Sequence, residues 1–408
     1  MHNTIFFLIL AIPVAGFIIE RYLVYLNAKM WSPSLPEKLK GICDEEKYRK
    51  TRLYDKDNMK LSFWSSLFNL AVIIVMIVTG GFALVDTFAH NLSGNSIIAA
   101  LIFFGIIGLG SDLINIPFSW YNTFVIEKKY GFNTMSVRIF ITDHIKSWLI
   151  ALLVGAPVLG LITWVYYSTG KGFWLYAWGV IILFSVFINL FYSELIVPLF
   201  NKQTPLKEGS LRNKIEDFAA MTGFRLRNIY VIDGSKRSTK ANAYFSGFGP
   251  KKRIVLYDTL LKEFSEDEVV AVLAHEVGHY RKKHVLKSLI LSVLLTGFML
   301  FLFSMVVDNP YFSKALGVEE PNFHIGLMVF GILYSPLSLL IGLVTNYISR
   351  KNEFEADRFA KENFKPAVLA NALKKLSLKN LSNLMPHPAY VFFHYSHPPL
   401  LSRLEKLE

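Results

Sequence analysis

The chain has 408 residues, of which 53% are hydrophobic, 15% aromatic and only 18% charged. Soluble globular domains carry about 25% charged residues. With a mean hydropathy of +0.38, this composition indicates a membrane protein and excludes a disordered chain. The single cysteine, Cys43, excludes an internal disulfide framework and a cysteine-based zinc site. The net charge of +12 indicates basic loops at an anionic membrane face, and we expect no nucleic-acid partner.

Seven runs with almost no charged residues are candidates for membrane-spanning helices. A helix needs about 20 apolar residues to cross the hydrocarbon core of a bilayer. In chain order the predicted spans are 3–19, 61–85, 95–121, 147–170, 172–193, 288–307 and 321–349, the third of which contains Asp112. The first run lacks the basic start and the cleavage site of a signal peptide, so we expect an uncleaved helix. The predicted fold is mostly α, a polytopic membrane protein with seven transmembrane helices.

The distribution of lysine and arginine predicts the orientation of these helices. Segment 29–60 carries nine of these residues and segment 201–287 carries seventeen, whereas segment 86–95 carries none. Because basic loops stay on the cytosolic side of a membrane, we expect the loops after odd-numbered spans and the C-terminal tail in the cytosol. The N-terminus is then expected on the outside, as an odd number of spans requires.

The same pattern divides the chain into four segments. We expect helices one to five with their loops in 1–200, a cytosolic segment in 201–287, helices six and seven in 288–349, and a C-terminal cytosolic segment in 350–408. Neither hydrophilic segment is large enough for a convincing independent domain. We therefore expect them to form one cytosolic cap on the helix bundle.

The sequence HEVGH at 275–279 is the most specific chemical signal in the chain. It lies on a predicted helix that begins with a capping box at 265–268. His275 and His279 are four residues apart, so they project from the same side of the helix and can hold one Zn²⁺ ion together. Glu276 can take a proton from a water held at the metal, as in HExxH metalloproteases.

A catalytic zinc needs a third protein ligand, and segment 350–358 offers one. Glu353 and Asp357 are four residues apart and share a helical face, whereas Glu355 points elsewhere. We predict Glu353 as the third ligand and Asp357 as the acceptor of a ligand histidine's N–H group. Taken alone, the segment is more typical of a solvated charged helix. An HExxH helix that needs a carboxylate favours the ligand interpretation.

Both predicted metal-binding segments adjoin a membrane span. Span 288–307 starts nine residues after His279, and Glu353 lies four residues after the end of span 321–349. At 1.5 Å per residue, these separations are about 13 Å and about 6 Å. The metal is therefore expected near the cytosolic membrane boundary, within reach of a membrane-anchored substrate. His284 falls about 140° off the ligand face of a continuous helix, which makes it a poor fourth ligand.

Two further segments have a weaker chemical signal. Segments 241–247 and 253–257 flank the turn FGPK at 248–251 and predict a β-hairpin. Such an edge strand can pair with the backbone of a peptide substrate, although a purely structural hairpin explains the pattern too. Near the C-terminus, HYSHPP at 394–399 is by position alone typical of a surface loop.

Together these motifs resemble one known family, the integral-membrane, zinc-dependent CAAX prenyl proteases of type I. The resemblance extends over nearly the whole chain. It rests on the seven spans and on HEVGH at 275–279, NAYFSG at 242–247, ExxxD at 353–357 and HYSHPP at 394–399. It implies a ring of seven membrane helices around a large water-filled chamber, closed by a zincin-like cytosolic cap that contains the small β-hairpin.

The resemblance also implies the substrate and the roles of individual residues. Substrates of the family end in Cys-aliphatic-aliphatic-X with a prenylated cysteine, lose their last three residues, and in some members are cut at a second, upstream site. One zinc ion per chain would be held by His275, His279 and Glu353, with Glu276 as the catalytic base. His397 would stabilise the oxyanion as a second catalytic residue, and Asn242 and Arg403 would bind the substrate. The expected partners are a prenylated or membrane-associated protein substrate and the lipid bilayer. We expect the chain to be a monomer.

Two other functions stay open at this point. One is a quality-control peptidase that uses the same zinc site on membrane proteins without prenyl dependence. The other is a transporter or receptor-like protein with a structural zinc, which predicts no cleavage. The last residues, 404–408, contain no dilysine signal for the endoplasmic reticulum. The sequence therefore favours a bacterial inner membrane, with the endoplasmic reticulum as the location in a eukaryote.

Overall fold

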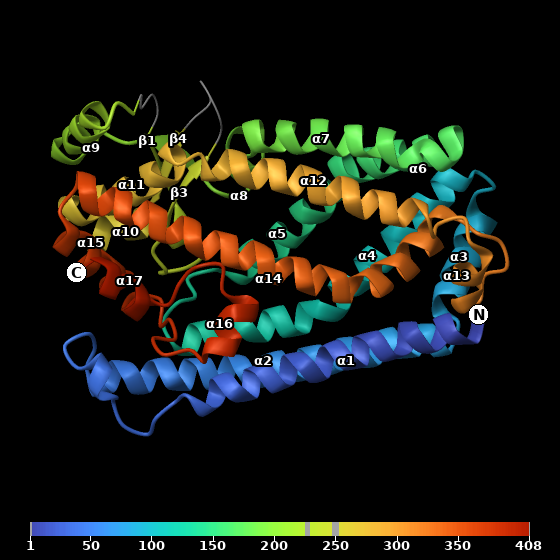
Figure 1. Ribbon diagram of the computed structural model, residues 1–408, viewed down its shortest axis with the longest axis horizontal. Helices are drawn as coiled ribbons and strands as arrows, with labels where there is room; N and C mark the ends of the chain where they lie inside the picture. Colours follow the sequence, from blue (N-terminus) through green and yellow to red (C-terminus); the bar gives the residue numbers. More distant parts are fainter. Residues whose placement is uncertain (1, 225–228, 247–252, 408) are drawn as a thin grey trace.

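Long apolar helices run along most of the molecule (Figure 1). The computed structural model describes residues 2–224, 229–246 and 253–407. The long helices are α1 (His2–Lys29), α2 (Glu45–Val78), α4 (Ser96–Tyr121), α5 (Val137–Ile150), α6 (Ala156–Thr169), α7 (Phe173–Phe191), α12 (His284–Ser304) and α14 (Phe323–Asn363). Three π-helical turns continue or join these helices: Asn122–Glu127, Ala151–Gly155 and Tyr192–Ile196.

Six stretches of the described residues are long and apolar enough to cross a membrane. The fourth, Val137–Phe200, is 64 residues long and contains two of the predicted spans. Near its middle the 3-10 turn Gly170–Gly172 separates α6 from α7, and Gly170 has a φ of 56° that favours glycine. Helices α6 and α7 then pack against each other. Length and composition thus give six candidates, and the count of seven stays a prediction.

The predicted second span, 61–85, is not one helix. Helix α2 ends at Val78, and the next helix, α3, is Gly81–Leu92. Gly80 between them has a φ of 69°, in the left-handed region. The uncharged run continues through this break, so hydropathy alone does not mark the end of the helix.

A four-stranded sheet lies at one end of the molecule. Its strands are β1 (Gln203–Pro205), β2 (Ile229–Ile232), β3 (Ala243–Ser246) and β4 (Arg253–Tyr257), in the spatial order β1-β2-β4-β3. The antiparallel pairing of β3 with β4 confirms the predicted hairpin strands, and the predicted turn at 248–251 lies outside the described residues. The sequence did not predict β1 and β2. Strand β2 runs parallel to β4, with Ile229 opposite Ile254.

The two ends of the molecule contain different helices and strands (Figure 1). The sheet gathers at one end with α9 (Ser210–Met221), α10 (Asp258–Glu263), α11 (Glu266–Arg281), α15 (Pro366–Lys379) and α17 (Leu400–Leu407). We call this end the cap end. Its core contains fully buried Leu256 from the sheet, Val270 and Leu273 from α11, and Ile215 from α9. Helices α3 and α13 (Pro310–Ala315) lie at the opposite end, and α14 connects the two ends. The other short helices of the described residues are α8 (Val197–Phe200), α16 (Pro388–His394) and the 3-10 turns Glu37–Leu39 and Gly234–Lys236.

Candidate metal centre

Helix α11 begins as the sequence predicts. The Ser265 hydroxyl accepts a hydrogen bond from the backbone N–H of Glu268, and the Glu268 carboxylate accepts one from the backbone N–H of Ser265. This capping box satisfies two of the free N–H groups at the helix start. Because the capping box fixes where α11 begins, it also helps to fix the rotation of α11 about its axis. In this orientation His275 and His279 point toward α14.

The close approach of α11 to α14 depends on Gly278. A Cβ atom at this position would lie 3.0 Å from the Cα and the carbonyl oxygen of Ala356 and 3.2 Å from the Cβ of Phe359. Only a residue without a side chain fits between the two helices without a shift of backbone. This contact places the HExxH motif of α11 directly against the segment of α14 that carries Glu353.

Three predicted ligands from these two helices meet at one point. The Nε2 atoms of His275 and His279 are 3.1 Å apart. The Nε2 atom of His275 lies 3.4 Å from Oε2 of Glu353, and the Nε2 atom of His279 lies 3.2 Å from Oε1. The three residues offer ligand atoms that all lie within 4.8 Å of one another. Two imidazoles and one carboxylate with an open fourth position are typical of a catalytic zinc site.

The charges at this cluster fit a cation. The Oε2 atom of Glu353 is buried and accepts no hydrogen bond from any described residue. A buried carboxylate oxygen without a donor is costly, and a metal ion would satisfy it. Burial lowers the pKa of His275, but the neighbouring carboxylates of Asp357 and Glu353 outweigh it and raise this pKa to about 9. The carboxylates around His275 therefore favour a positive charge at this point, which a metal ion would supply.

A second layer of contacts orients His275. The Oδ1 atom of Asp357 lies 2.8 Å from the Nδ1 atom of His275, and Asp357 is 1% exposed. Arg403 from α17 donates to both oxygens of Asp357, at 2.6 and 2.8 Å. Its Nη1 atom lies 3.6 Å from Glu353. Asp357 thus receives the ring N–H of His275 on one side and a two-pronged guanidinium on the other, which fixes its orientation.

His279 has its own supporting chain, which the sequence did not predict. Its Nδ1 atom lies 3.1 Å from Nδ1 of His284, and Nε2 of His284 lies 3.1 Å from the carboxylate of Glu355. A continuous helix was expected through this region, but α11 ends at Arg281, and Lys283 has a φ of 58°. This break redirects His284 to the back of His279. Glu355 points away from the metal-facing atoms, as predicted, and contacts His284 instead.

The other predicted site residues lie around the cluster. Glu276 is half-buried and next to His275 on α11. His397 is exposed, and its Nε2 atom lies 3.3 Å from Oε1 of Glu353. Asn242 is exposed and directly precedes β3, and its backbone carbonyl accepts a hydrogen bond from Tyr257.

Strand β3 forms one edge of the sheet beside α11. It pairs with β4 on one side, and no strand of the described residues lies on its other side. It also packs against α11, the helix that carries His275 and His279. An edge strand next to the metal cluster can bind an extended peptide by adding a strand to the sheet.

The fold and the site together define a class, that of polytopic membrane metallopeptidases with an HExxH helix. A family model described as "CAAX prenyl protease N-terminal, five membrane helices" matches residues 25–202, and a model of peptidase family M48 matches residues 205–408. The chain belongs to the CAAX prenyl proteases of family M48. Membership of this metallopeptidase family implies a bound metal ion, and the three converging ligands provide a place for it.

Individual relatives match along nearly the whole chain. The CAAX prenyl protease 1 homolog of Oryza sativa subsp. japonica is 37% identical over 98% of this chain and 96% of its own length. CAAX prenyl protease 1 of Saccharomyces cerevisiae is 36% identical over 97% and 93%. The crystal structure of S. mikatae Ste24p superposes with a TM-score of 0.94 at 36% identity and covers 99% of both chains.

Proposed function

We propose that this chain is a zinc metalloendopeptidase that removes the last three residues of prenylated proteins ending in Cys-aliphatic-aliphatic-X. One observation carries this proposal: His275, His279 and Glu353 converge on one point in a chain of this family. The relatives named CAAX prenyl protease 1 support the substrate class. The partners would be a prenylated protein and the lipid bilayer, and we expect one zinc ion per chain at this site.

The arrangement in the membrane is part of the same proposal. Stretch 137–200 would cross the bilayer twice by folding back at Gly170–Gly172, which gives seven spans. The basic loops would place the cap end and the metal centre in the cytosol. The resemblance to Ste24p supports a ring of helices around a chamber that opens to the metal centre. The division at 200, 287 and 349 follows from this arrangement.

Each site residue receives a role in peptide hydrolysis. When bound by His275, His279 and Glu353, zinc would supply a Lewis acid and a site for the attacking water. Glu276 would take a proton from that water and pass it to the leaving amine. His397, at the exposed side of the cluster, would donate a hydrogen bond to the developing oxyanion.

Two residues would act on the substrate. Asn242, at the start of edge strand β3, would bind the peptide backbone as the substrate pairs with the strand. Arg403 already binds both oxygens of Asp357, so its first role would be to orient the support of His275. A contact between Arg403 and a substrate carboxylate stays a prediction.

The test compares two fluorogenic peptides on the purified full chain in detergent. One peptide is farnesylated at its C-terminal Cys-aliphatic-aliphatic-X sequence, and the other lacks the lipid. We expect cleavage of the farnesylated peptide only, and its loss in Glu276→Gln and with a chelator. Glu266→Gln is the matched control, because Glu266 is on the same helix but pairs with Lys214 in the first turn, away from the metal.

The alternatives predict different outcomes. Equal cleavage of both peptides would replace prenyl processing with general membrane-protein proteolysis at the same centre. Bound zinc without cleavage of either peptide would favour a transporter or receptor-like protein with a structural zinc. Full activity in Glu276→Gln would contradict the base assignment.

A further inference from the structure

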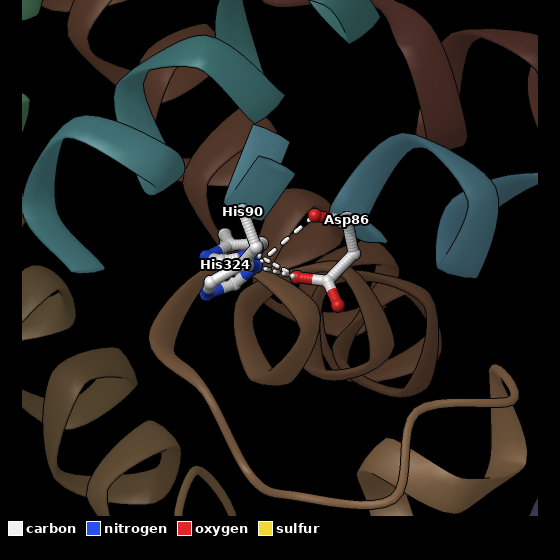
Figure 2. Close-up of side chains that lie close together, drawn as sticks. All are labelled: Asp86, His90 and His324. Atoms are coloured by element: carbon white, nitrogen blue, oxygen red, sulfur yellow. Dashed lines mark hydrogen bonds and ion pairs between the residues drawn. The ribbon is translucent and has the colours of Figure 1, made fainter. Parts of the chain in front are cut away.

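A second cluster of metal-binding side chains lies at the opposite end of α14. It consists of Asp86 and His90 on α3 and His324 at the start of α14 (Figure 2). His324 precedes Glu353 by 29 residues, which corresponds to about 44 Å along a helix. This cluster is therefore separate from the proposed catalytic centre, and neither the family resemblance nor the proposed function uses it.

The ligand atoms of this second cluster also lie close together. The Nε2 atom of His324 lies 2.6 Å from Oδ1 of Asp86, and the Nδ1 atom of His90 lies 3.2 Å from the same oxygen. Among the described residues, two groups place three ligand atoms within 4.8 Å of one another, and the other is the cluster of the metallopeptidase motif. Ligands bound tetrahedrally to one zinc at about 2.0–2.1 Å lie about 3.3 Å apart.

The fold holds two of these ligands in place. His324 is fully buried, and its ring centroid lies 4.7 Å from that of Phe103. Asp86 is 7% exposed and accepts a hydrogen bond from the side-chain amide of Asn322 at 3.1 Å. Asn322 is itself fixed, since its Oδ1 atom caps α14 by accepting from the backbone N–H of Ile325. A metal would meet ligands that are already ordered, so binding costs little conformational entropy.

The charge of Asp86 also points to a cation. Among the residues that the structure describes, the carboxylate of Asp86 contacts two imidazoles and one amide, and no lysine or arginine. A buried carboxylate needs a compensating charge, which here requires either a protonated histidine or a bound metal. The side chain of His90 is 39% exposed, so an ion can enter from solvent, and a water can complete its coordination.

We propose that Asp86, His90 and His324 bind a zinc ion that fastens α3 to the start of α14. Two imidazole nitrogens and one carboxylate oxygen suit zinc among the divalent metals. The ion would cross-link two helices that contact the membrane region at the end opposite the cap end. Its role would be structural, because the described residues of the cluster offer no neighbouring base comparable to Glu276.

The experiment counts zinc on the full chain in detergent. Each variant is stripped with a chelator, reloaded with zinc chloride, desalted and analysed by elemental mass spectrometry. We expect two zinc ions per wild-type chain, one in His90→Ala, one in Glu353→Gln and none in the double variant. Asp86→Asn, which preserves the size of a buried side chain, should also bind one. None of these counts requires peptide cleavage, so the result does not depend on the proposed function.

A matched control separates a metal site from an ordinary histidine–carboxylate pair. His144 lies 3.2 Å from the carboxylate of Asp112 and belongs to neither three-ligand group, so His144→Ala should still bind two zinc ions. Zinc should also raise the melting temperature of Glu353→Gln but not that of the Glu353→Gln, His90→Ala double variant. Equal zinc counts in wild type and His90→Ala, or no zinc in Glu353→Gln, would overturn the proposal.

Discussion

The two three-ligand clusters at the ends of α14 are built in the same way but supported differently. In each, one helix supplies two ligands four residues apart, and α14 supplies the third. The cap-end cluster uses His275 and His279 with Glu353, whereas the far cluster uses Asp86 and His90 with His324. Spacing of four residues on a helix is a local property, and the third ligand depends on how α14 packs against that helix.

The two clusters differ in the number of contacts that support their ligands. At the cap end, both histidines have further partners: Asp357 and Arg403 behind His275, and His284 and Glu355 behind His279. At the far end, Asn322 contacts Asp86, Nδ1 of His90 also contacts the backbone carbonyl of Asp86, and the His90 side chain is 39% exposed. Outer contacts orient ligands and tune the basicity of a metal site. This difference is expected between a catalytic centre that performs proton transfer and a structural metal site that only joins two helices.

The largest expected effect separates the clusters by function. Glu353→Gln removes the charged third ligand at the cap end, and we expect peptidase activity to fall by more than about 100-fold, beyond the loss typical of outer contacts. His90→Gln, at the far cluster, should change the rate by less than about twofold. Both rates are measured with the farnesylated peptide at saturating zinc. A comparable loss in both variants would show that the two clusters are coupled.

An intermediate effect is expected at Asp357. Asp357→Asn keeps the size of the side chain but removes the charge that faces His275 and Arg403. Loss of such a contact typically weakens metal binding by about 10- to 100-fold. Zinc affinity is measured by competition with a chelating dye. Asp267→Asn serves as the control, since Asp267 pairs with lysines at the exposed start of α11, and it should bind zinc like the wild type.

The same comparison shows how far the sequence could predict the structure. His275, His279, Glu353 and Asp357 were predictable because each pair shares one face of one helix, a local pattern that hydrophobic packing preserves. Strands β1 and β2 were not, because a strand of three or four residues is defined by its partner across the sheet. The grouping of Asp86 with His324 joins positions 238 residues apart, which only the folded helix bundle brings together.

The contact of His284 with His279 has a local cause that the sequence did not reveal. The prediction extended α11 past Arg281, where the actual helix ends before the left-handed residue Lys283. Lysine has no particular preference for this conformation, so no residue type marked the break. A change of helix direction between His279 and His284 brings together side chains that a continuous helix would separate.

The smallest expected effect is a loss of zinc affinity when His284 or Glu355, the residues behind His279, is replaced. It tests whether their hydrogen bonds support zinc binding by His279. If His279 binds zinc through Nε2, its Nδ1 carries a proton and can donate to Nδ1 of His284, whose Nε2–H can then donate to Glu355. Glu355 is about one-third exposed, so Glu355→Gln should leave the fold intact. We expect zinc affinity to fall by no more than about tenfold in His284→Ala and in Glu355→Gln.

The double variant provides the decisive comparison for this relay. Since Glu355 acts on His279 only through His284, the loss in the double variant should equal the loss in His284→Ala alone rather than the sum of both single losses. Zinc affinities of the four proteins, measured by the same dye competition, complete this cycle. Additive losses would mean that the two residues act independently. In that case the supporting contacts at the cap end would be those of Asp357 and Arg403 alone. The two clusters at the ends of α14 would then differ only in the contacts that orient His275.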